Sequence, residues 1–265
     1  MNEPTVQFAE IVYGGSVPLD DPAETFHEAS RLYPSTALAA LPGAALLEED
    51  AHMRASAARS SRRHPHREGI ALPRRKLPPV PLQAVLDGRV SRPPAVRQPL
   101  PLAGLAAILG AAYGVETTGR GRRRPVPSAG ALYPLELYVA TPGGFFVYDP
   151  PHHRLVRRSD DDLLGAMQWA ALSQDAIGRC PTVFVLAAVP GRTATKYGSR
   201  AQRYVQLEAG HAAQNLLLEA AAHDLGAVPI GAFDDARVRE VLDLPADTDV
   251  LYLIPVGEPA SKTIG

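Results

Sequence analysis

The chain has 265 residues, a formal net charge of −1 and 46% hydrophobic side chains, enough to bury the core of one large domain. This charge balance gives no support to a bulk attraction to nucleic acid or to an anionic membrane surface. The single cysteine, Cys180, excludes an internal disulfide. The first ten residues lack the pattern of a signal peptide, and the longest apolar run, residues 100–115, falls short of the ~20 residues of a membrane-spanning helix. We therefore expect a soluble cytoplasmic protein.

Residues 1–80 differ from the rest in composition. Residues 23–32 predict a short amphipathic helix, and residues 35–53 predict an Ala-rich helix broken at a Pro-Gly pair. The prolines of residues 59–82 are typical of an extended linker with polyproline II character. We predict that residues 1–80 form an N-terminal extension, partly helical and Pro-rich, on a main domain of residues 81–265.

In the main domain, helical and strand patterns alternate. Pro142-Gly143-Gly144 between two apolar runs indicates a hairpin, and residues 182–189 are typical of a central buried strand. The helix predicted at residues 199–225 is apolar on nearly all sides, which predicts burial and favours a subunit interface. The pattern predicts an α+β fold, a mixed sheet sandwiched by helices. The other expected helices are 83–86, 102–113, 160–172 and 234–242, and the other strands are 135–140, 145–148 and 250–256.

Several common motifs are missing from the sequence. No Gly-x-Gly-x-x-Gly follows a strand, and there is neither a Walker lysine nor a Gly-x-Ser-x-Gly elbow. The pairs His64/His66 and His152/His153 lack cysteine or carboxylate partners at metal spacing, so we predict no metal site. Nicotinamide in a Rossmann pocket, phosphoryl transfer and zinc hydrolysis are therefore disfavoured.

Two arginine-containing turns could bind an anion. Arg89, Ser91 and Arg92 offer guanidinium and hydroxyl donors that suit a phosphate, although a solvent-exposed basic turn is the simpler interpretation. The run 120–125 could be an RNA-binding patch, a solvated loop or the approach to a cofactor. Without interleaved aromatic residues, nucleic acid is the least favoured of the three. Arg124 is the arginine of this run that we expect near a ligand.

The dipeptide Lys196-Tyr197 has the composition of an acid–base pair. Only three of the 27 basic residues are lysine, and an ammonium can lose its proton where a guanidinium cannot. A tyrosine beside a cation has a stabilised phenolate, which makes a plausible base. An ordinary polar helix start is the competing interpretation. Glu208 and His211, three residues apart on one helix face, could be catalytic, but a structural hydrogen-bonded pair is the favoured interpretation.

Three segments together resemble one family, the flavin enzymes of the nitroreductase fold, and specifically the SagB-type azoline dehydrogenases. The resemblance covers roughly residues 85–260. It is carried by the Pro-Ser-Ala-Gly-Ala-Leu-Tyr-Pro run at 127–134, by the Leu-Gly-x-x-Pro-Ile-x-x-Phe-Asp run at 225–234, and by Lys196-Tyr197 with the residues that follow it. Those residues are Arg203, Tyr204, Glu208, Ala209, Gly210, His211 and Asn215.

The resemblance implies that FMN is the cofactor. Arg89 and Ser91 would clamp its phosphate, with Arg92 in place of the basic residue usual at Pro93. Two small-residue turns would flank the isoalloxazine ring, with backbone N–H groups of the second turn at flavin N5 and O4. Gly231 replaces an acid common in ordinary nitroreductases, which favours a different chemistry. The remaining cofactor contacts implied are Arg124, Ser128, Gly130, Ala131, Gly231 and Ala232.

The implied activity is the oxidation of thiazolines or oxazolines to thiazoles or oxazoles in a ribosomally made peptide. Tyr197 would be the base and Lys196 its tuner or a substrate clamp, and these roles could be exchanged. The resemblance also implies a homodimer, an azoline-containing precursor peptide as substrate, and a complex with a cyclodehydratase. We expect no nucleic-acid or membrane partner. The alternatives are an NAD(P)H-dependent nitro, quinone or flavin reductase of the same fold, and a non-catalytic scaffold in a peptide-modifying complex.

Overall fold

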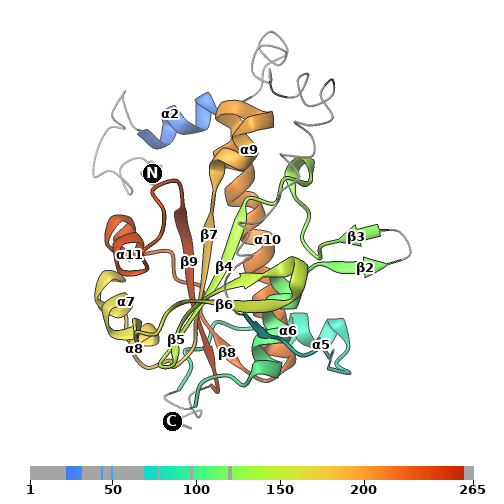
Figure 1. Cartoon of the computed structure of the whole chain (residues 1–265), viewed down its shortest axis with the longest axis vertical. Coiled ribbons are helices and arrows are strands. Elements are labelled where there is room, and N and C mark those ends of the chain that lie inside the picture. Colours follow the sequence, from blue (N-terminus) through green and yellow to red (C-terminus); the bar gives the residue numbers. More distant parts are fainter. Residues whose placement is uncertain are drawn as a thin grey trace, which may run out of the picture.

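The computed structural model describes residues 22–31, 43, 49, 69–76, 78–95, 98–118 and 121–259. Its strands form a seven-stranded sheet in the order β1-β6-β5-β4-β7-β9-β8 and a separate ribbon, β2-β3 (Figure 1). The strands are β1 (Gly69–Ala71), β2 (Glu116–Thr118), β3 (Gly121–Arg123), β4 (Leu135–Thr141), β5 (Gly144–Asp149), β6 (Arg154–Ser159), β7 (Val183–Ala188), β8 (Gly226–Ala227) and β9 (Asp249–Gly257).

Helices cover both faces of the sheet. The α-helices are α2 (Pro22–Ala29), α5 (Leu82–Gly88), α6 (Leu102–Tyr113), α7 (Leu164–Ala170), α8 (Asp175–Gly178), α9 (Pro190–Tyr197), α10 (Ala201–Ala222) and α11 (Asp235–Val241). Three 3₁₀ turns are η1 (Ala129–Ala131), η2 (Pro150–His152) and η3 (Gly198–Arg200). None of the helices within the described ranges is long and apolar enough to cross a membrane.

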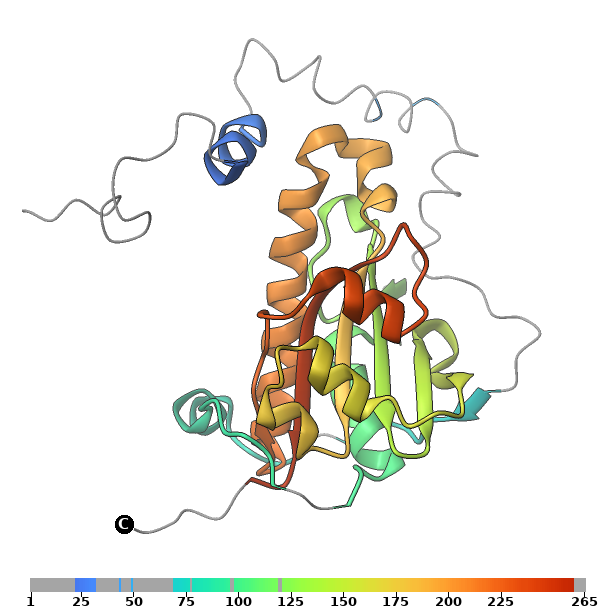
Figure 2. The same ribbon diagram turned by 90° about the vertical axis from the view of Figure 1, so that its left-hand side faces the viewer.

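Two hydrophobic clusters hold these layers together. On one face of the sheet, Leu137 and Leu186 pack with α6 and α10. On the other face, Val183 and Val185 pack with α7, α8 and α11, which lie toward the viewer in Figure 2. All residues of β7 are buried, because the strand lies in the middle of the sheet under helices on both sides. This confirms the predicted central strand and the α+β class.

The sheet differs from the prediction in one respect. Every hydrogen-bonded strand pair of the described residues is antiparallel, so the sheet is not mixed. Consecutive strands β4, β5 and β6 are joined by short turns, which reverse the chain direction each time. The Pro142-Gly143-Gly144 hairpin is confirmed: Thr141 pairs with Gly144. The capped helix after Asp234 is confirmed as well, since the Asp234 side chain accepts a hydrogen bond from the N–H of Arg237.

The long apolar helix is shorter and less enclosed than predicted. Residues 199–200 belong to η3, and α9, which the sequence reasoning missed, precedes it. One face of α10 is buried, but the opposite face carries an exposed stripe within this single chain. The stripe consists of Gln206, Leu207, Gly210, His211 and Gln214.

The N-terminal extension is described in part. Helix α2 confirms the short helix predicted at residues 23–32, whereas the helix predicted at 35–53 lies outside the described residues except for Gly43 and Glu49. Strand β1 pairs with β6 at the edge of the main sheet, although it precedes the boundary predicted at residue 80. That boundary stays a prediction.

The buried position of β7 predicts the effect of a cavity there. Leu186→Ala removes a side chain that is 0% exposed, so we expect a loss of ~2–5 kcal/mol in the free energy of unfolding. Leu86→Ala on α5, where the side chain is 48% exposed, is the matched control and should cost about 0.5 kcal/mol or less. Urea denaturation followed by circular dichroism measures both, and equal losses would contradict the assignment of β7 to the core.

Candidate functional site

The glycine-containing turn at η1 has an unusual backbone. Gly130, Ala131 and Tyr133 all have positive φ, at 61°, 54° and 46°. Only glycine adopts this region without strain, so the two other residues need support from their surroundings. Ser128 gives part of it: its Oγ accepts a hydrogen bond from the N–H of Tyr133 at 2.9 Å, and its carbonyl accepts one from the N–H of Ala131 at 3.0 Å.

The end of α9 packs directly on this turn. A Cβ atom placed on Gly130 would lie 3.0 Å from the Tyr197 hydroxyl and 3.2 Å from Cδ of Lys196. The Lys196 Nζ atom is 5.5 Å from the centroid of the Tyr197 ring. The structure therefore brings the two predicted catalytic side chains against one of the predicted cofactor-binding residues, although 65 positions separate Gly130 from them in the sequence.

A buried ion pair anchors α9 to the sheet. The Arg192 guanidinium on α9 pairs with the carboxylate of Glu136 on β4, and the side chains are 14% and 4% exposed. The Tyr138 hydroxyl donates a second hydrogen bond to Glu136 at 2.9 Å. Beyond α9, the Tyr197 ring packs edge to face on Tyr204 of α10, with 4.9 Å between centroids. Helix α9 is thereby held at its start by charge and at its end by aromatic packing.

A second buried carboxylate lies behind the glycine turn. Glu208 of α10 is 3% exposed and accepts a 2.6 Å hydrogen bond from the hydroxyl of Tyr113 on α6. The same hydroxyl accepts a hydrogen bond from the N–H of Leu135 at 3.2 Å, and the Ser128 side chain also hydrogen-bonds to Glu208. One carboxylate thus links α10, α6, the glycine turn and the start of β4.

Arg124 supplies the positive charge of this cluster. Its guanidinium lies between two rings, 4.4 Å from the centroid of Tyr113 and 4.6 Å from that of Tyr133. It also donates a hydrogen bond to the carbonyl of Tyr113 at 3.1 Å. Stacking between two aromatic faces suits the flat, weakly hydrated guanidinium. Arg124 is therefore held within the protein by its own neighbours.

Burial shifts the titration of these groups. Burial raises the pKa of Glu208, against the opposing effect of hydrogen bonds from Ser128 and Tyr113 and of the Arg124 charge. Burial, followed by the Glu208 charge, raises the pKa of Tyr113 well above its ordinary value. Burial lowers the pKa of Arg124. At this buried position, the Glu208 carboxylate and the Arg124 guanidinium would each destabilise the fold if the other charge were removed.

These contacts alter the interpretation of several predicted residues. Arg124 hydrogen-bonds to Tyr113, and Ser128 hydrogen-bonds to Tyr133 and Glu208. The first role of both residues is therefore to hold the turn. Glu208 bonds to Tyr113 and Ser128, whereas His211 is exposed, so the predicted Glu208–His211 pair is wrong. The sequence reasoning missed Tyr113, Tyr133, Glu136 and Arg192. A tyrosine at the end of an apolar helix was a usable signal for Tyr113, because a buried hydroxyl needs a partner.

The predicted phosphate-binding residues lie at the other end of α10. Arg89 follows the last turn of α5, and the N–H of Arg92 donates a hydrogen bond to the carbonyl of Ala227 on β8 at 3.2 Å. Ser91 and Arg92 are exposed and Arg89 is partly exposed. Two guanidinium groups and a hydroxyl on a backbone tied to the sheet have the chemistry that a phosphate monoester requires.

The second predicted cofactor segment bridges β9 and α7. Ile230 exchanges two backbone hydrogen bonds with Leu253 of β9, and the N–H of Asp234 donates to the carbonyl of Ala170 on α7. Gly231 and Ala232 between them are exposed, and a Cβ on Gly231 would meet only Tyr252, at 3.9 Å. Neither N–H donates a hydrogen bond to a backbone carbonyl of the described residues. Both remain available to an acceptor from outside.

The two glycine-containing segments have different neighbours. The 128–131 turn lies against α9 and the Glu208 cluster, whereas residues 231–232 lie between β9 and α7 with the Gln174 side chain on the carbonyl of Ala232. No hydrogen bond between the backbones of the described residues joins the two segments. Their predicted grip on one flat ring stays a prediction.

The geometry at Gly130 predicts opposite outcomes for two Gly→Ala changes. Gly130→Ala places an alanine at positive φ and displaces Tyr197, so we expect a loss of ~1–2 kcal/mol in the free energy of unfolding. Gly165→Ala is the control, because its site on α7 is open and alanine favours a helix; it should gain about 0.5–1 kcal/mol. Chemical denaturation measures both, and a stabilised Gly130→Ala variant would contradict the packing of Tyr197 on this turn.

The burial of Glu208 predicts a pH dependence. Because the folded state raises this pKa above the ordinary value of 4.5, the folded protein holds the proton more tightly than the unfolded chain. The contribution of Glu208 to the free energy of unfolding is therefore highest below that value and falls as the pH rises toward the folded-state pKa. The free energy of unfolding of the native protein, measured relative to that of Glu208→Gln, should accordingly decrease as the pH rises from about 4 to about 8. Glu240→Gln, at an exposed position on α11, is the control and should follow the native profile; a Glu208 difference that does not change with pH would refute the assignment.

Comparisons with known proteins give the family. The model of the nitroreductase family matches residues 89–258. A "putative nitroreductase" of Methanocaldococcus jannaschii is 43% identical over an alignment of 182 residues that covers 66% of this chain and 90% of that protein. The solved structure of a "putative nitroreductase" from Ralstonia eutropha superposes with a TM-score of 0.66 at 31% identity, over 77% of this chain and 94% of that one.

A more distant structure shares the fold alone. The NADPH:FMN oxidoreductase of Vibrio harveyi, solved in complex with NAD⁺, matches with a TM-score of 0.52 at 18% identity, over 68% of this chain and 69% of that one. The predicted nitroreductase-like fold is thus confirmed. The family model matches more than half of this chain, and the chain therefore belongs to the nitroreductase family.

Proposed function

We propose that this protein is an FMN-dependent oxidoreductase that converts thiazolines or oxazolines into thiazoles or oxazoles in a ribosomally made peptide. One observation carries the proposal: Lys196 and Tyr197 pack on Gly130. This contact puts an acid–base pair on the turn that resembles the flavin-binding segment of the azoline dehydrogenases. An ordinary polar helix start would not require that contact.

The residues present fit FMN at two separate places. Arg89, Ser91 and Arg92 would hold its phosphate, since their donors lie at the surface on a fixed backbone. The free N–H groups of Gly231 and Ala232 would face the ring from a second copy of the chain. FMN would supply the redox chemistry there, as hydride acceptor for the oxidised ring, with dioxygen as the final oxidant.

The contribution of the chain itself is to position the substrate and to take the proton. Tyr197 would act as the base, and the Lys196 Nζ atom lies 5.5 Å from its ring centroid. Lys196 would act as the tuner of Tyr197 or as a substrate clamp, and the roles of the two residues could be exchanged. Contact with Tyr204 and Gly130 restricts the Tyr197 ring, which keeps its hydroxyl in place.

The exposed stripe of α10 supports a homodimer, whereas the other proposed partners rest on the resemblance to the azoline dehydrogenases. Leu207 on this stripe is 54% exposed, and among the described residues nothing outside the backbone of α10 and the two chain neighbours lies within 4 Å of a Cβ placed on Gly210. An apolar side chain beside an open glycine suits close packing of a second helix, so we propose a homodimer. The substrate would be an azoline-containing precursor peptide, and a cyclodehydratase that forms the azoline would be a partner in the same complex.

A second candidate is an NAD(P)H-dependent reductase of nitro compounds, quinones or flavins. The fold likeness to the NADPH:FMN oxidoreductase of Vibrio harveyi favours it. The presence of Gly231 in place of an acid, and the Lys196–Tyr197 pair on Gly130, favour the azoline oxidation instead. A scaffold without flavin is the third candidate.

The test uses the purified full chain with FMN and a synthetic thiazoline peptide. We expect a yellow protein and a mass loss of two hydrogen atoms per ring under air. Lys196→Ala and Tyr197→Phe should each lower the rate by about 100-fold or more while FMN stays bound, because each removes a proton-transfer group. Lys76→Ala, which changes an exposed lysine, is the control and should keep the native rate.

Each other outcome selects a different function. Steady NAD(P)H consumption with a nitroaromatic and no mass loss from the peptide would select the reductase. A colourless protein that takes up no added FMN would select the scaffold. Near-native rates in both site variants would show that Lys196 and Tyr197 are not the catalytic residues.

A further inference from the structure

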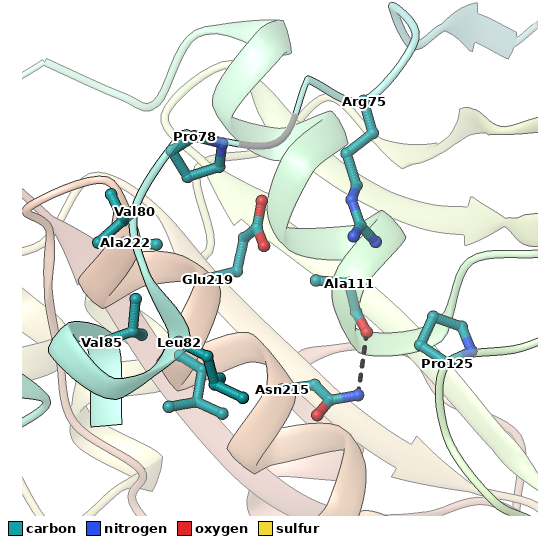
Figure 3. A pocket seen from close by; sticks show the side chains of 11 residues that line it. Arg75, Pro78, Val80, Leu82, Val85, Ala111, Pro125, Asn215, Glu219 and Ala222 are labelled. Carbon is teal, nitrogen blue, oxygen red and sulfur yellow. Dashed lines mark hydrogen bonds between the residues drawn. The ribbon is translucent and has the colours of Figure 1, made fainter. Parts of the chain in front are cut away.

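A cavity of about 350 Å³ lies between α5, α6, the last turns of α10 and the segment that precedes α5 (Figure 3). Its walls are largely apolar, formed by Pro78, Val80, Val85, Leu218 and Ala222. This volume is at the lower end of the range of small-molecule pockets. From Tyr204, beside the Lys196–Tyr197 site, to Glu219 in the cavity, α10 advances 15 residues, or about 22 Å at 1.5 Å per residue. The cavity is therefore remote from the Lys196–Tyr197 pair, and its wall residue Val85 lies on α5, the helix that ends at the proposed phosphate-binding turn.

One wall of the cavity carries a buried carboxylate oxygen that lacks a hydrogen-bond donor. Glu219 of α10 is 9% exposed, and its Oε1 atom is buried without a hydrogen bond from any described residue. The Nε2 atom of the His223 imidazole is 3.4 Å from Oε1, without hydrogen-bond geometry. A buried carboxylate oxygen without a donor is costly, so this position favours a ligand that brings one.

A guanidinium lines the same cavity. Arg75 lies across α6, where a Cβ on Gly110 would come within 3.0 Å of its Cδ, so the glycine makes room for the side chain. The Arg75 side chain is 22% exposed, and its Nη1 atom is 4.0 Å from the exposed carboxylate of Glu116. In Figure 3 the Arg75 and Glu219 side chains both reach into the space between α6 and α10. The cavity therefore has two polar groups of opposite charge within apolar walls.

We propose that this cavity binds a small zwitterion with an apolar body, of the class of the apolar amino acids. Its ammonium lies at Glu219 and supplies the missing donor, its carboxylate lies at Arg75, and its hydrocarbon part lies on the valine, leucine and proline wall. A simple amine would be repelled by Arg75, and a simple carboxylic acid by Glu219. Charge complementarity thus selects the ligand that carries both groups.

The experiment uses three probes of nearly equal shape with the full-length protein. L-Leucine carries both charges, isoamylamine lacks the carboxylate, and isocaproate lacks the ammonium. Calorimetric titration should show saturable binding of leucine that is at least about tenfold tighter than binding of either analogue, because each lacks one charge-assisted contact. No saturable binding of leucine, or binding equal to that of an analogue, overturns the proposal.

Two variants separate the two charges. Glu219→Gln keeps the side-chain shape and should weaken leucine about tenfold, to the level of isocaproate, while Arg75→Gln should weaken it to the level of isoamylamine. Glu240→Gln on α11, on the opposite face of the sheet, is the control and should bind leucine as the native protein does. Ala222→Leu fills the cavity from α10 and should abolish binding of all three probes. Thermal unfolding of each variant verifies the fold, and unchanged leucine affinity in folded Glu219→Gln or Ala222→Leu overturns the site.

Discussion

The burial of the Glu208 carboxylate constrains this structure more than any other interaction. The residue sits in the middle of a 22-residue helix, among the apolar side chains that pack α10 on α6. A carboxylate in that position must receive hydrogen bonds and a counter-charge, or the fold loses several kcal/mol. Tyr113 and Ser128 give the hydrogen bonds, and Arg124 gives the charge from between two tyrosine rings. The need to satisfy one acid thus joins four segments of the chain.

The glycine turn at η1 depends on this cluster. The Ser128 side chain hydrogen-bonds to Glu208, and its Oγ atom accepts a hydrogen bond from the N–H of Tyr133. Between Ser128 and Tyr133, the backbone has positive φ angles at Gly130 and Ala131. A strained turn of this kind persists only where its surroundings fix it. A second buried acid, Glu136, fixes the other half of the site, because it binds Arg192 and so sets where α9 delivers Lys196 and Tyr197. The proposed catalytic surface is therefore assembled by two buried carboxylates that take no part in the chemistry.

Much of the fold could be predicted from the sequence, and the failures have a physical pattern. Helix α6, the β4–β5 hairpin, β7 and the capped α11 were predicted because each has a strong local pattern: an apolar run, a Pro-Gly-Gly turn, a β-branched run and an aspartate cap. Strand β6 was missed, since Arg157 and Arg158 hide its alternation, and α9 was missed because its eight residues include Pro190 and Gly191. The direction of strand pairing was wrong because it depends on how turns connect distant strands, which no single segment encodes.

The sequence by itself determined which residue types were available for chemistry: the Lys196-Tyr197 pair, the small residues at 130 and 231, and the Arg-x-Ser-Arg turn. Those features are visible because they are short and chemically distinctive. Only the tertiary structure decided that Lys196 and Tyr197 pack on Gly130, that Arg124 and Ser128 interact with Glu208, and that Glu219 and Arg75 line one cavity. Contacts of this kind join residues that lie tens of positions apart, and their partners are selected by burial and charge satisfaction after the chain has folded.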